Sequence, residues 1–278
     1  MRKWITLMNG MWAIAVLAGC AATPSNYLPP LADPPTEVHR TGAFIWFDLL
    51  SENPKVASNF YSQLFGWRIE SDTTVEDYSI IYNGDRPIGG IIRHENRDSR
   101  AAESIWLAVL SVEDVDQAVT TARDAGGKVL EGPIDVDGRG RIALIEDTAG
   151  AALILLRTAG GDPAARKPRT GDWLWTDLIT PDGDPVQAFY KQLADYQLEP
   201  LQADDDAYHV FKRSGRTQAG MVELKWQGIE ANWLPYVKVD KIDKQITRAR
   251  ELGGTLIIKS GDAAVIMDPT GAAIGIQE

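Results

Sequence analysis

The sequence is poor in the residues from which several kinds of site are built. It contains one cysteine and three histidines in 278 residues. A single cysteine excludes an intrachain disulfide framework and any zinc site made of four thiolates. Basic residues are also in deficit, because 28 Lys and Arg stand against 39 Asp and Glu, which gives a net charge of −11. This deficit argues against nucleic-acid binding, which normally needs a basic face.

The one cysteine, Cys20, ends the most specific local motif of the chain. A short basic start and an uncharged stretch from Trp4 to Ala18 precede it, and the stretch closes as Leu17-Ala18-Gly19-Cys20. An uncleaved membrane anchor fits less well than a cleaved secretory signal, because the apolar run is shorter than the roughly 20 residues that span a bilayer. The four closing residues resemble a bacterial lipobox. That resemblance implies that residues 1–19 are removed and that Cys20 carries the lipid that attaches the protein to a membrane.

The residues after Cys20 bear on the location of the protein. In lipoproteins of bacteria with two membranes, an Asp after the cysteine favours retention in the inner membrane, and this chain has Ala21 there. The resemblance therefore implies a protein of the bacterial cell envelope on the periplasmic side, with the outer membrane favoured. Residues 20–40 contain five prolines and few large apolar side chains. This composition predicts a semi-extended tether rather than a folded segment.

The rest of the chain is an internal repeat. Gly42–Leu49 returns as Gly171–Leu178, and Phe60-Tyr61 returns as Phe189-Tyr190, each 129 residues later. Repetition on this scale has to be recognised before a fold is assigned. It predicts two domains of one plan, at residues 41–158 and 171–278, with a linker at residues 159–170 that has no periodic apolar residues.

Within each copy, strand and helix periodicities alternate. Ala43–Leu50 has the alternation of a strand, and Asn53-Pro54 has the form of a helix start, followed by apolar residues at four-residue spacing up to Gly66. Further strands follow, and the same order begins again near Ile105. The prediction is an α+β fold in which each domain contains two βαβββ modules.

These features resemble the vicinal oxygen chelate superfamily, which includes glyoxalases, bleomycin resistance proteins and extradiol dioxygenases. The resemblance rests on the Trp-x-Asp-Leu first strand, the Phe-Tyr helix, the Ala-Gly-Gly turn and the Asp-x-x-Gly final hairpin, and it runs from about residue 42 to the C-terminus. It implies that each pair of modules curls its sheet into an open, cup-shaped mixed sheet with helices on the convex side. Two copies in one chain would mimic a homodimeric relative, so a monomer with pseudo-dimeric domains is expected.

The resemblance also implies a divalent metal, held inside the cup by His, Glu or Gln. The corresponding positions are Trp46, Leu107 and Ile154 in the first copy and Trp175, Leu234 and Gly275 in the second. None of these side chains is a metal ligand. The three histidines, His39, His94 and His209, do not cluster in the sequence. We therefore predict no cofactor, and a divalent metal would need a rearranged site that uses Asp48, Asp177 or His209.

A repeated acid between aromatic residues remains as the candidate site. Strand alternation places Phe44 beside Trp46 and Asp48 on the face that would line the cup, and Ile45 on the opposite face. In the second copy the same alternation places Trp173 in the cup and Leu174 under the helices. The expected ligand-binding residues are Trp46, Asp48, Trp106, Trp175, Asp177, Trp233 and Tyr236. An acid beside Trp rings in an apolar cavity favours a cationic or hydrogen-bond-donating ligand.

Three functions stay open at this point. The first is a lipid-anchored protein that binds a small molecule in one or both cups without a metal ion. The second is a metal-dependent lyase, isomerase or dioxygenase of the same superfamily with a rearranged site. The third is a structural or interaction protein in which Trp side chains fill the cups as core, and an Arg or a backbone N–H satisfies each Asp.

Overall fold

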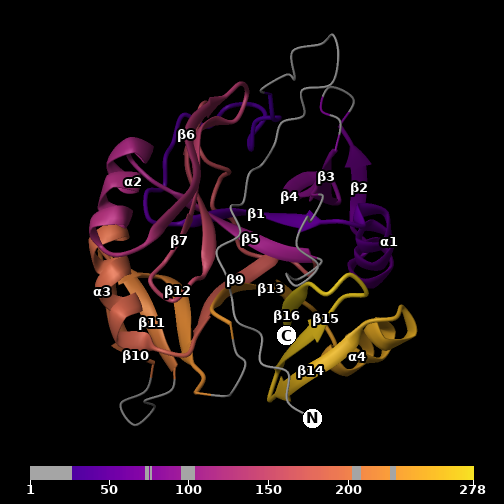
Figure 1. Ribbon diagram of the computed structural model, residues 1–278. Coiled ribbons are helices and arrows are strands. Elements are labelled where there is room, and N and C mark those ends of the chain that lie inside the picture. Colours follow the sequence, from indigo (N-terminus) through magenta and orange to yellow (C-terminus); the bar gives the residue numbers. More distant parts are fainter. Residues whose placement is uncertain (1–26, 73–74, 76, 95–103, 202–207, 226–229) are drawn as a thin grey trace.

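The computed structural model describes residues 27–72, 75, 77–94, 104–201, 208–225 and 230–278. The lipobox-like motif and Cys20 lie outside these residues. The described chain forms two domains of the same plan, each with one open sheet of eight strands (Figure 1). None of the helices in the described ranges has the length and apolar character needed to cross a membrane.

The first domain contains two consecutive modules of strand, helix and three strands. The first module comprises β1 (Phe44–Ser51), α1 (Pro54–Phe65), β2 (Arg68–Ser71), β3 (Tyr78–Asn83) and β4 (Arg86–Arg93). The second comprises β5 (Ser104–Ser111), α2 (Val115–Asp124), β6 (Lys128–Val136), β7 (Gly140–Glu146) and β8 (Ala152–Thr158). The strands lie in the order β2-β3-β4-β1-β5-β8-β7-β6, so β1 and β5 join the modules at the centre of the sheet.

The second domain repeats this order. Its first module comprises β9 (Trp173–Thr180), α3 (Gly183–Ala194), β10 (Gln197–Pro200), β11 (Tyr208–Arg213) and β12 (Arg216–Glu223). Its second comprises β13 (Asn232–Lys238), α4 (Ile242–Glu251), β14 (Thr255–Ser260), β15 (Ala263–Met267) and β16 (Ala273–Gln277). The strand order β10-β11-β12-β9-β13-β16-β15-β14 matches that of the first sheet. The predicted α+β fold of paired modules is confirmed.

The helices start and end where local chemistry favours it. Pro54 occupies the first turn of α1, where a missing N–H costs no hydrogen bond. Gly66 ends that helix in the left-handed conformation, and its N–H donates to the carbonyl of Ser62 at 3.0 Å. The side chain of Asp114 caps α2 by accepting a 2.9 Å hydrogen bond from the N–H of Gln117.

A bulge at the start of β1 changes which side chains face the cup, the face of each sheet opposite the helices. Phe44 pairs with Leu110 and Trp46 with Val109, so Ile45 is an extra residue in the strand. An extra residue shifts the alternation by one position. Phe44 therefore packs in the main core, whereas Ile45 and Trp46 pack together in the cup. The prediction that Phe44 faces the cup and that Ile45 faces the opposite side was wrong for this reason.

The second copy has the same irregularity. Tyr236 pairs with Trp175 and Val237 with Trp173, which leaves Leu174 as the extra residue. The Trp173 ring lies outside the second cup, with its centroid 5.2 Å from that of Trp106 in the first domain. Leu174 lines the second cup instead. The bulge thus reverses the predicted positions of Trp173 and Leu174.

The two domains meet across an interface with pseudo-twofold symmetry. The indole N–H of Trp67 donates to the carbonyl of Gly171 at 2.7 Å, and the hydroxyl of Tyr196 donates to the carbonyl of Gly42 at 2.6 Å. Trp67 corresponds to Tyr196 and Gly42 to Gly171, in each case 129 residues apart in the repeat. Helix α2 lies beside α3 and α1 beside α4 (Figure 1). One continuous hydrophobic core runs through both domains.

Residues 27–40, which we call the strap, pack along the first domain. The N–H of Leu28 donates to the carbonyl of Asp137 at 2.9 Å, and the N–H of Thr36 donates to that of Gly160 at 2.9 Å. The N–H of Arg40 donates to the buried carboxylate of Asp162 at 2.6 Å. The composition predicts a semi-extended tether rather than a folded segment here, because proline lacks an N–H and favours extended chain. The described part of the strap instead packs on the first domain, because its carbonyl and remaining N–H groups form hydrogen bonds there and its apolar side chains make contacts.

Candidate ligand-binding site

The first cup contains a buried carboxylate between two aromatic donors. Asp48, on β1, is 3% exposed. Its Oδ1 accepts a 2.9 Å hydrogen bond from the indole N–H of Trp46 and a 3.1 Å hydrogen bond from the hydroxyl of Tyr78. Strand β4 lies between β1 and β3, so the Tyr78 side chain reaches across it to the carboxylate. The tyrosine was not predicted, because only the folded sheet brings it to the Trp-x-Asp motif.

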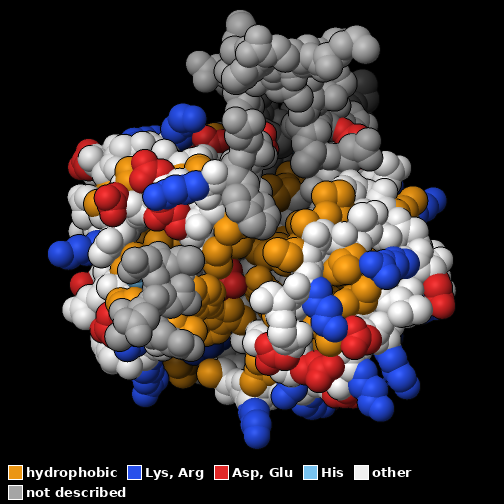
Figure 2. All heavy atoms as spheres, turned by 90° about the horizontal axis from the view of Figure 1, so that it is seen from below, with side chains coloured by type: hydrophobic (Ala, Val, Ile, Leu, Met, Phe, Trp, Pro, Cys, Tyr) orange, Lys and Arg blue, Asp and Glu red, His pale blue; other side chains and the backbone are white. Residues whose placement is uncertain are grey.

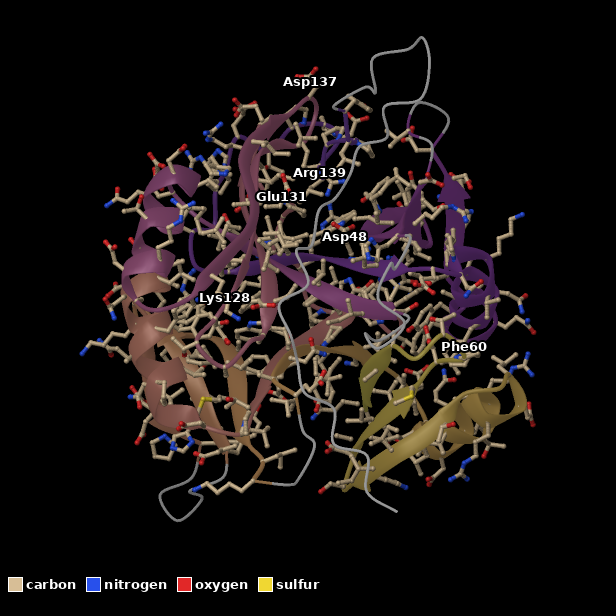
Figure 3. The ribbon with its side chains drawn as sticks, viewed as in Figure 1. Asp48, Phe60, Lys128, Glu131, Asp137 and Arg139 are labelled. Carbon is tan, nitrogen blue, oxygen red and sulfur yellow. The ribbon has the colours of Figure 1, made fainter. Side chains whose placement is uncertain are left out.

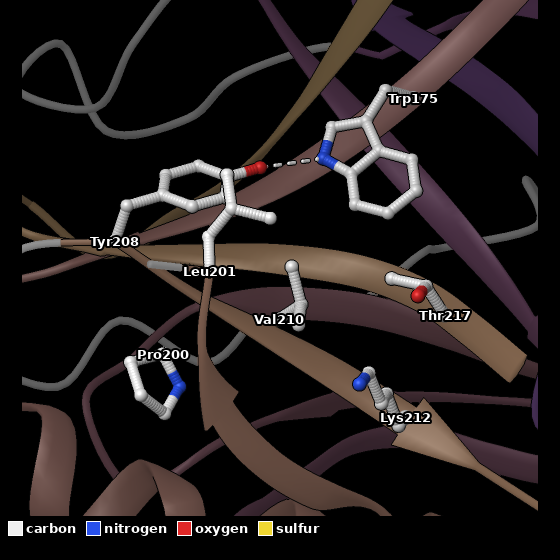
Figure 4. A pocket seen from close by; sticks show the side chains of 7 residues that line it. All are labelled: Trp175, Pro200, Leu201, Tyr208, Val210, Lys212 and Thr217. Carbon is white, nitrogen blue, oxygen red and sulfur yellow. Dashed lines mark hydrogen bonds between the residues drawn. The ribbon is translucent and has the colours of Figure 1, made fainter. Parts of the chain in front are cut away.

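The second cup repeats this group of side chains. Oδ1 of Asp177 accepts hydrogen bonds from the indole N–H of Trp175 at 2.7 Å and from the hydroxyl of Tyr208 at 2.8 Å. The same indole N–H lies 2.9 Å from the Tyr208 hydroxyl (Figure 4). Tyr236, on β13, also hydrogen-bonds to Asp177. Three of the residues that we expect to bind a ligand, Trp175, Asp177 and Tyr236, thus lie together.

In each cup, a strand glycine leaves the space that the acid and the tyrosine occupy. A Cβ added to Gly90 on β4 would lie 2.3 Å from Oδ1 of Asp48, and one added to Gly220 on β12 would lie 2.1 Å from Oδ1 of Asp177. Glycine inside a strand commonly marks such a close approach. Gly90 and Gly220 are 130 residues apart and follow the repeat, but only the folded sheet shows that they lie against the acids.

An arginine closes the first cup. Arg139 lies between β6 and β7, and its Nη1 is 3.8 Å from Oδ2 of Asp48 (Figure 3). Its Nη2 donates to the hydroxyl of Tyr78 at 2.8 Å, and its Nε donates to the carbonyl of Pro29 in the strap at 2.9 Å. Only 3% of the arginine is exposed. The first acid is therefore paired with a buried cation, which is the arrangement expected of a structural carboxylate.

The strap fills the remaining space of the first cup. Leu31 is 3% exposed and packs with Trp46, Ile45, Val109 and Leu156. Trp46 is correspondingly only 2% exposed. The first cup is thus filled as core, as in the third function considered from the sequence. Its central side chain, however, is a leucine from outside the domain.

The second cup has neither of these features among the residues that the structure describes. Its β14–β15 hairpin turns between Ser260 and Ala263, whereas the corresponding hairpin of the first copy runs on to the loop that carries Arg139. Gly275 on β16 allows the ring of Tyr236 to cross the strand, since an added Cβ would lie 2.3 Å from that ring. Among the described residues, the second acid is therefore held by hydroxyl and indole donors and not by a guanidinium.

Two adjoining hollows open in the second cup. One has a volume of about 290 Å³ and is lined by Leu174, Trp175, Tyr208 and Gln277. The other has a volume of about 420 Å³ and is lined by Trp175, Pro200, Leu201, Tyr208, Val210, Lys212 and Thr217 (Figure 4). Seen from below, hydrophobic side chains gather in the hollowed face of the molecule (Figure 2). The hollows share Trp175 and Tyr208, the two aromatic side chains that donate hydrogen bonds to Asp177.

The two acids have different electrostatic surroundings. Burial raises the pKa of Asp177, and the hydrogen bonds from Tyr208, Trp175 and Tyr236 offset only part of that rise. Burial also raises the pKa of Asp48, and there the charge of Arg139 opposes the rise. Asp177 can accept a hydrogen bond from a ligand when ionised and donate one when protonated. It can also stabilise a ligand cation, because no guanidinium of the described residues compensates its charge.

Two predicted members of the site lie elsewhere. The indole N–H of Trp106 donates to the hydroxyl of Tyr61 on α1 at 3.0 Å, and that of Trp233 donates to the hydroxyl of Tyr190 on α3 at 2.8 Å. Both rings are in the main core on the helix side of the sheets. The prediction that they form cup walls is wrong, because it is the next residue along β5, Leu107, that pairs with Asp48 on the cup face.

The side chains at the family's metal positions do not suit a metal ion. Within the described residues, no three His, Cys, Asp or Glu side chains come together in a way that could hold one. Asp48 and Asp177 lie in different domains and are surrounded by N–H and O–H donors. His209 alternates with Tyr208 and Val210 along β11, so it faces away from the hollow that they line. In the described part of the chain, Asp48, Asp177 and His209 therefore do not come together as a rearranged metal site.

Comparison with family models covers both domains. Residues 43–155 match the Glyoxalase/Bleomycin resistance protein/Dioxygenase superfamily, and residues 173–276 match a glyoxalase-like domain. These ranges coincide with the two sheets and their helices.

Relatives of similar length support the tandem arrangement. The protein named "Putative glyoxylase CFP32" of Mycobacterium tuberculosis is 27% identical over 253 residues, which cover 87% of this chain and 97% of that protein. The anthracycline biosynthesis protein DnrV of Streptomyces peucetius is 29% identical over 262 residues, which cover 85% of this chain and 93% of that protein.

Solved structures with the same fold include a homoprotocatechuate 2,3-dioxygenase from Brevibacterium fuscum in complex with 3,4-dihydroxyphenylacetate. Its TM-score is 0.60 at 13% identity, and the match covers 88% of this chain and 82% of that one. A Mn(II)-bound glyoxalase from Novosphingobium aromaticivorans has a TM-score of 0.58 at 13% identity, with 86% and 82% covered. At this level of identity the likeness concerns the fold.

Proposed function

Because the chain belongs to the glyoxalase/bleomycin resistance protein/dioxygenase superfamily, we propose that it binds a small, mainly apolar molecule in the cup of its second domain. Trp175, Tyr208 and Asp177 provide the contacts that metal ligands provide in other members. The first domain serves as the partner that completes the core.

The observation that carries this proposal is the contrast between the two cups. Both contain the same Trp, Asp, Tyr and Gly, but Leu31 and Arg139 fill the first cup, and the second is hollow among the described residues. Only the second cup leaves its tryptophan partly exposed. A largely apolar cavity with one placed polar group is the usual form of a small-molecule site.

The lining indicates the class of ligand. Trp175 and Tyr208 offer ring surfaces on which a planar molecule can stack. Asp177 favours a hydrogen-bond donor or a cationic group on that molecule. Lys212 lies in the wall of the cavity and pairs with Glu199 at 2.5 Å, so the rim is close to neutral. A planar ring system that carries an amine or hydroxyl fits this lining, and the name of the relative DnrV suggests an anthracycline as a first probe.

Calorimetric titration of the purified protein with a daunosamine-containing anthracycline tests the proposal. We expect saturable binding to one site, and we expect Trp175→Phe to weaken it at least about tenfold by removing ring area and the indole N–H. The matched control is Trp46→Phe, at the equivalent position of the filled cup, which should leave the affinity unchanged. Equal losses in both variants would contradict the assignment to the second cup, as would failure of this probe and of a panel of planar amines and phenols to bind.

We also propose that the protein acts at the cell envelope, attached by lipid at Cys20. The lipobox-like motif Leu17-Ala18-Gly19-Cys20 supports this. The site would then take its ligand from the periplasm, with the outer membrane as the favoured location.

A further inference from the structure

We infer that the first cup is a second binding site, for a small branched apolar molecule that carries a carbonyl or carboxylate oxygen, and that the strap residues 27–31 occupy it as a built-in competitor. The inference concerns the other domain and stands independently of ligand binding in the second cup.

The contacts of the strap identify the chemistry that the first cup accepts. The isobutyl group of Leu31 packs on Trp46 between Ile45, Val109 and Leu156. Two residues earlier, the carbonyl oxygen of Pro29 accepts the hydrogen bond from Nε of Arg139. The cup thus recognises a branched apolar group together with an oxygen acceptor, and neither feature requires a peptide.

The hydrogen-bond donors of Arg139 favour a filled first cup over an empty one. Its Nη1 and Nη2 groups face Asp48 and Tyr78, and its Nε depends on the strap carbonyl. A buried guanidinium N–H without an acceptor is costly, so an emptied cup favours any molecule that restores this hydrogen bond. A carboxylate restores it as a charge-assisted bond, which is stronger than the bond to a neutral carbonyl.

The strap is attached at two places that can separate. Near its C-terminal end, Thr36 and Arg40 hydrogen-bond to Gly160 and Asp162 of the linker. Near its N-terminal end, Leu28 bonds to Asp137, and Leu31 fills the cup. Between them, residues 33–35 are exposed. The cup-filling part can therefore leave while the attachment to the linker stays in place.

The test uses 4-methylpentanoate, which joins the branched end of a leucine side chain to a carboxylate. Leu31→Ser removes most of the apolar contact that holds the strap in the cup, so this variant should bind the probe at least about tenfold more tightly than the parent protein. Val38→Ser is the matched control, because Val38 belongs to the same strap and is 58% exposed. It should bind like the parent. Equal affinities in the parent and in a folded Leu31→Ser variant would overturn the inference.

Two further measurements assign the position of the probe. Adding Arg139→Lys to Leu31→Ser should abolish the gain in affinity, whereas adding Trp175→Phe should leave it intact and so separate this site from the second cup. In the parent protein, saturating probe should increase hydrogen exchange at the Leu28 amide and leave the Thr36 amide protected. Probe binding without faster exchange at Leu28 would show that the strap is not displaced, and would also overturn the inference.

Discussion

Replacing Arg139 by Met leaves Asp48 as a buried carboxylate without a cation. Both side chains are 3% exposed and their charged atoms are 3.8 Å apart. At that separation and an effective dielectric constant of about 20, the attraction is about 4 kcal/mol. Removal of one partner of a buried ion pair typically costs about 3–5 kcal/mol, which agrees. We therefore expect Arg139→Met to lower the free energy of unfolding at pH 7 by about 4 kcal/mol and the melting temperature by about 10 °C.

The pH dependence distinguishes loss of the ion pair from loss of packing. Without Arg139, only the hydrogen bonds from Trp46 and Tyr78 oppose the effect of burial, so the pKa of Asp48 rises further above its ordinary value of 3.8. A group whose pKa is higher in the folded state binds a proton more tightly there, so folding is favoured as the pH falls. The deficit of Arg139→Met should therefore be smaller at pH 5 than at pH 7. Urea denaturation at both pH values measures it.

Two control variants complete this experiment. Asp48→Asn combined with Arg139→Met removes both charges and should recover most of the lost stability, except for about 2 kcal/mol from the lost hydrogen bonds to Pro29 and Tyr78. Arg157→Met breaks the solvent-exposed pair with Glu113 and should cost less than about 1 kcal/mol. The reasoning is refuted if the double variant is no more stable than Arg139→Met, or if the deficit is the same at pH 5 and pH 7.

Two other predictions concern the second cup and the N-terminus. Burial raises the pKa of Asp177, so the parent loses stability as the pH rises from about 3.8 through that raised pKa. The Asp177→Asn variant lacks this loss. In denaturation experiments, the free energy of unfolding of the variant minus that of the parent should therefore increase with pH. A difference that stays constant with pH would exclude a raised pKa. Metabolic labelling with radioactive palmitate should mark the parent protein and not Cys20→Ser, and equal labelling of both would contradict lipidation at Cys20.

The fold was predictable because the repeat supplies each signal twice. Asn53-Pro54 and the four-residue spacing after it predict α1, and the family resemblance correctly predicts the paired modules in one open sheet. The faces of β1 and β9 were not predictable from strict alternation, because Ile45 and Leu174 are extra residues whose presence shows only in the pairing with β5 and β13.

The acid and the tryptophan of each cup were predictable because they are two residues apart on one strand. Their partners were not, since Tyr78 comes from another strand and Arg139 lies 91 residues further along the chain than Asp48. The long hairpin between Gly126 and Asp147 marks a difference between the copies in the sequence. Only the folded structure shows that this difference places a cation against the first acid.

The covalent linkage of the two copies has a consequence for the pseudo-twofold interface. In a dimer of identical subunits, an arginine-bearing hairpin added to one cup would appear in both, and both sites would close together. In a single chain, each half can change alone while the matched contacts from Trp67 to Gly171 and from Tyr196 to Gly42 hold the halves in register. The two halves thus stay symmetric at their interface and differ in whether the cup is filled. One protein can therefore combine a closed cup and an open one.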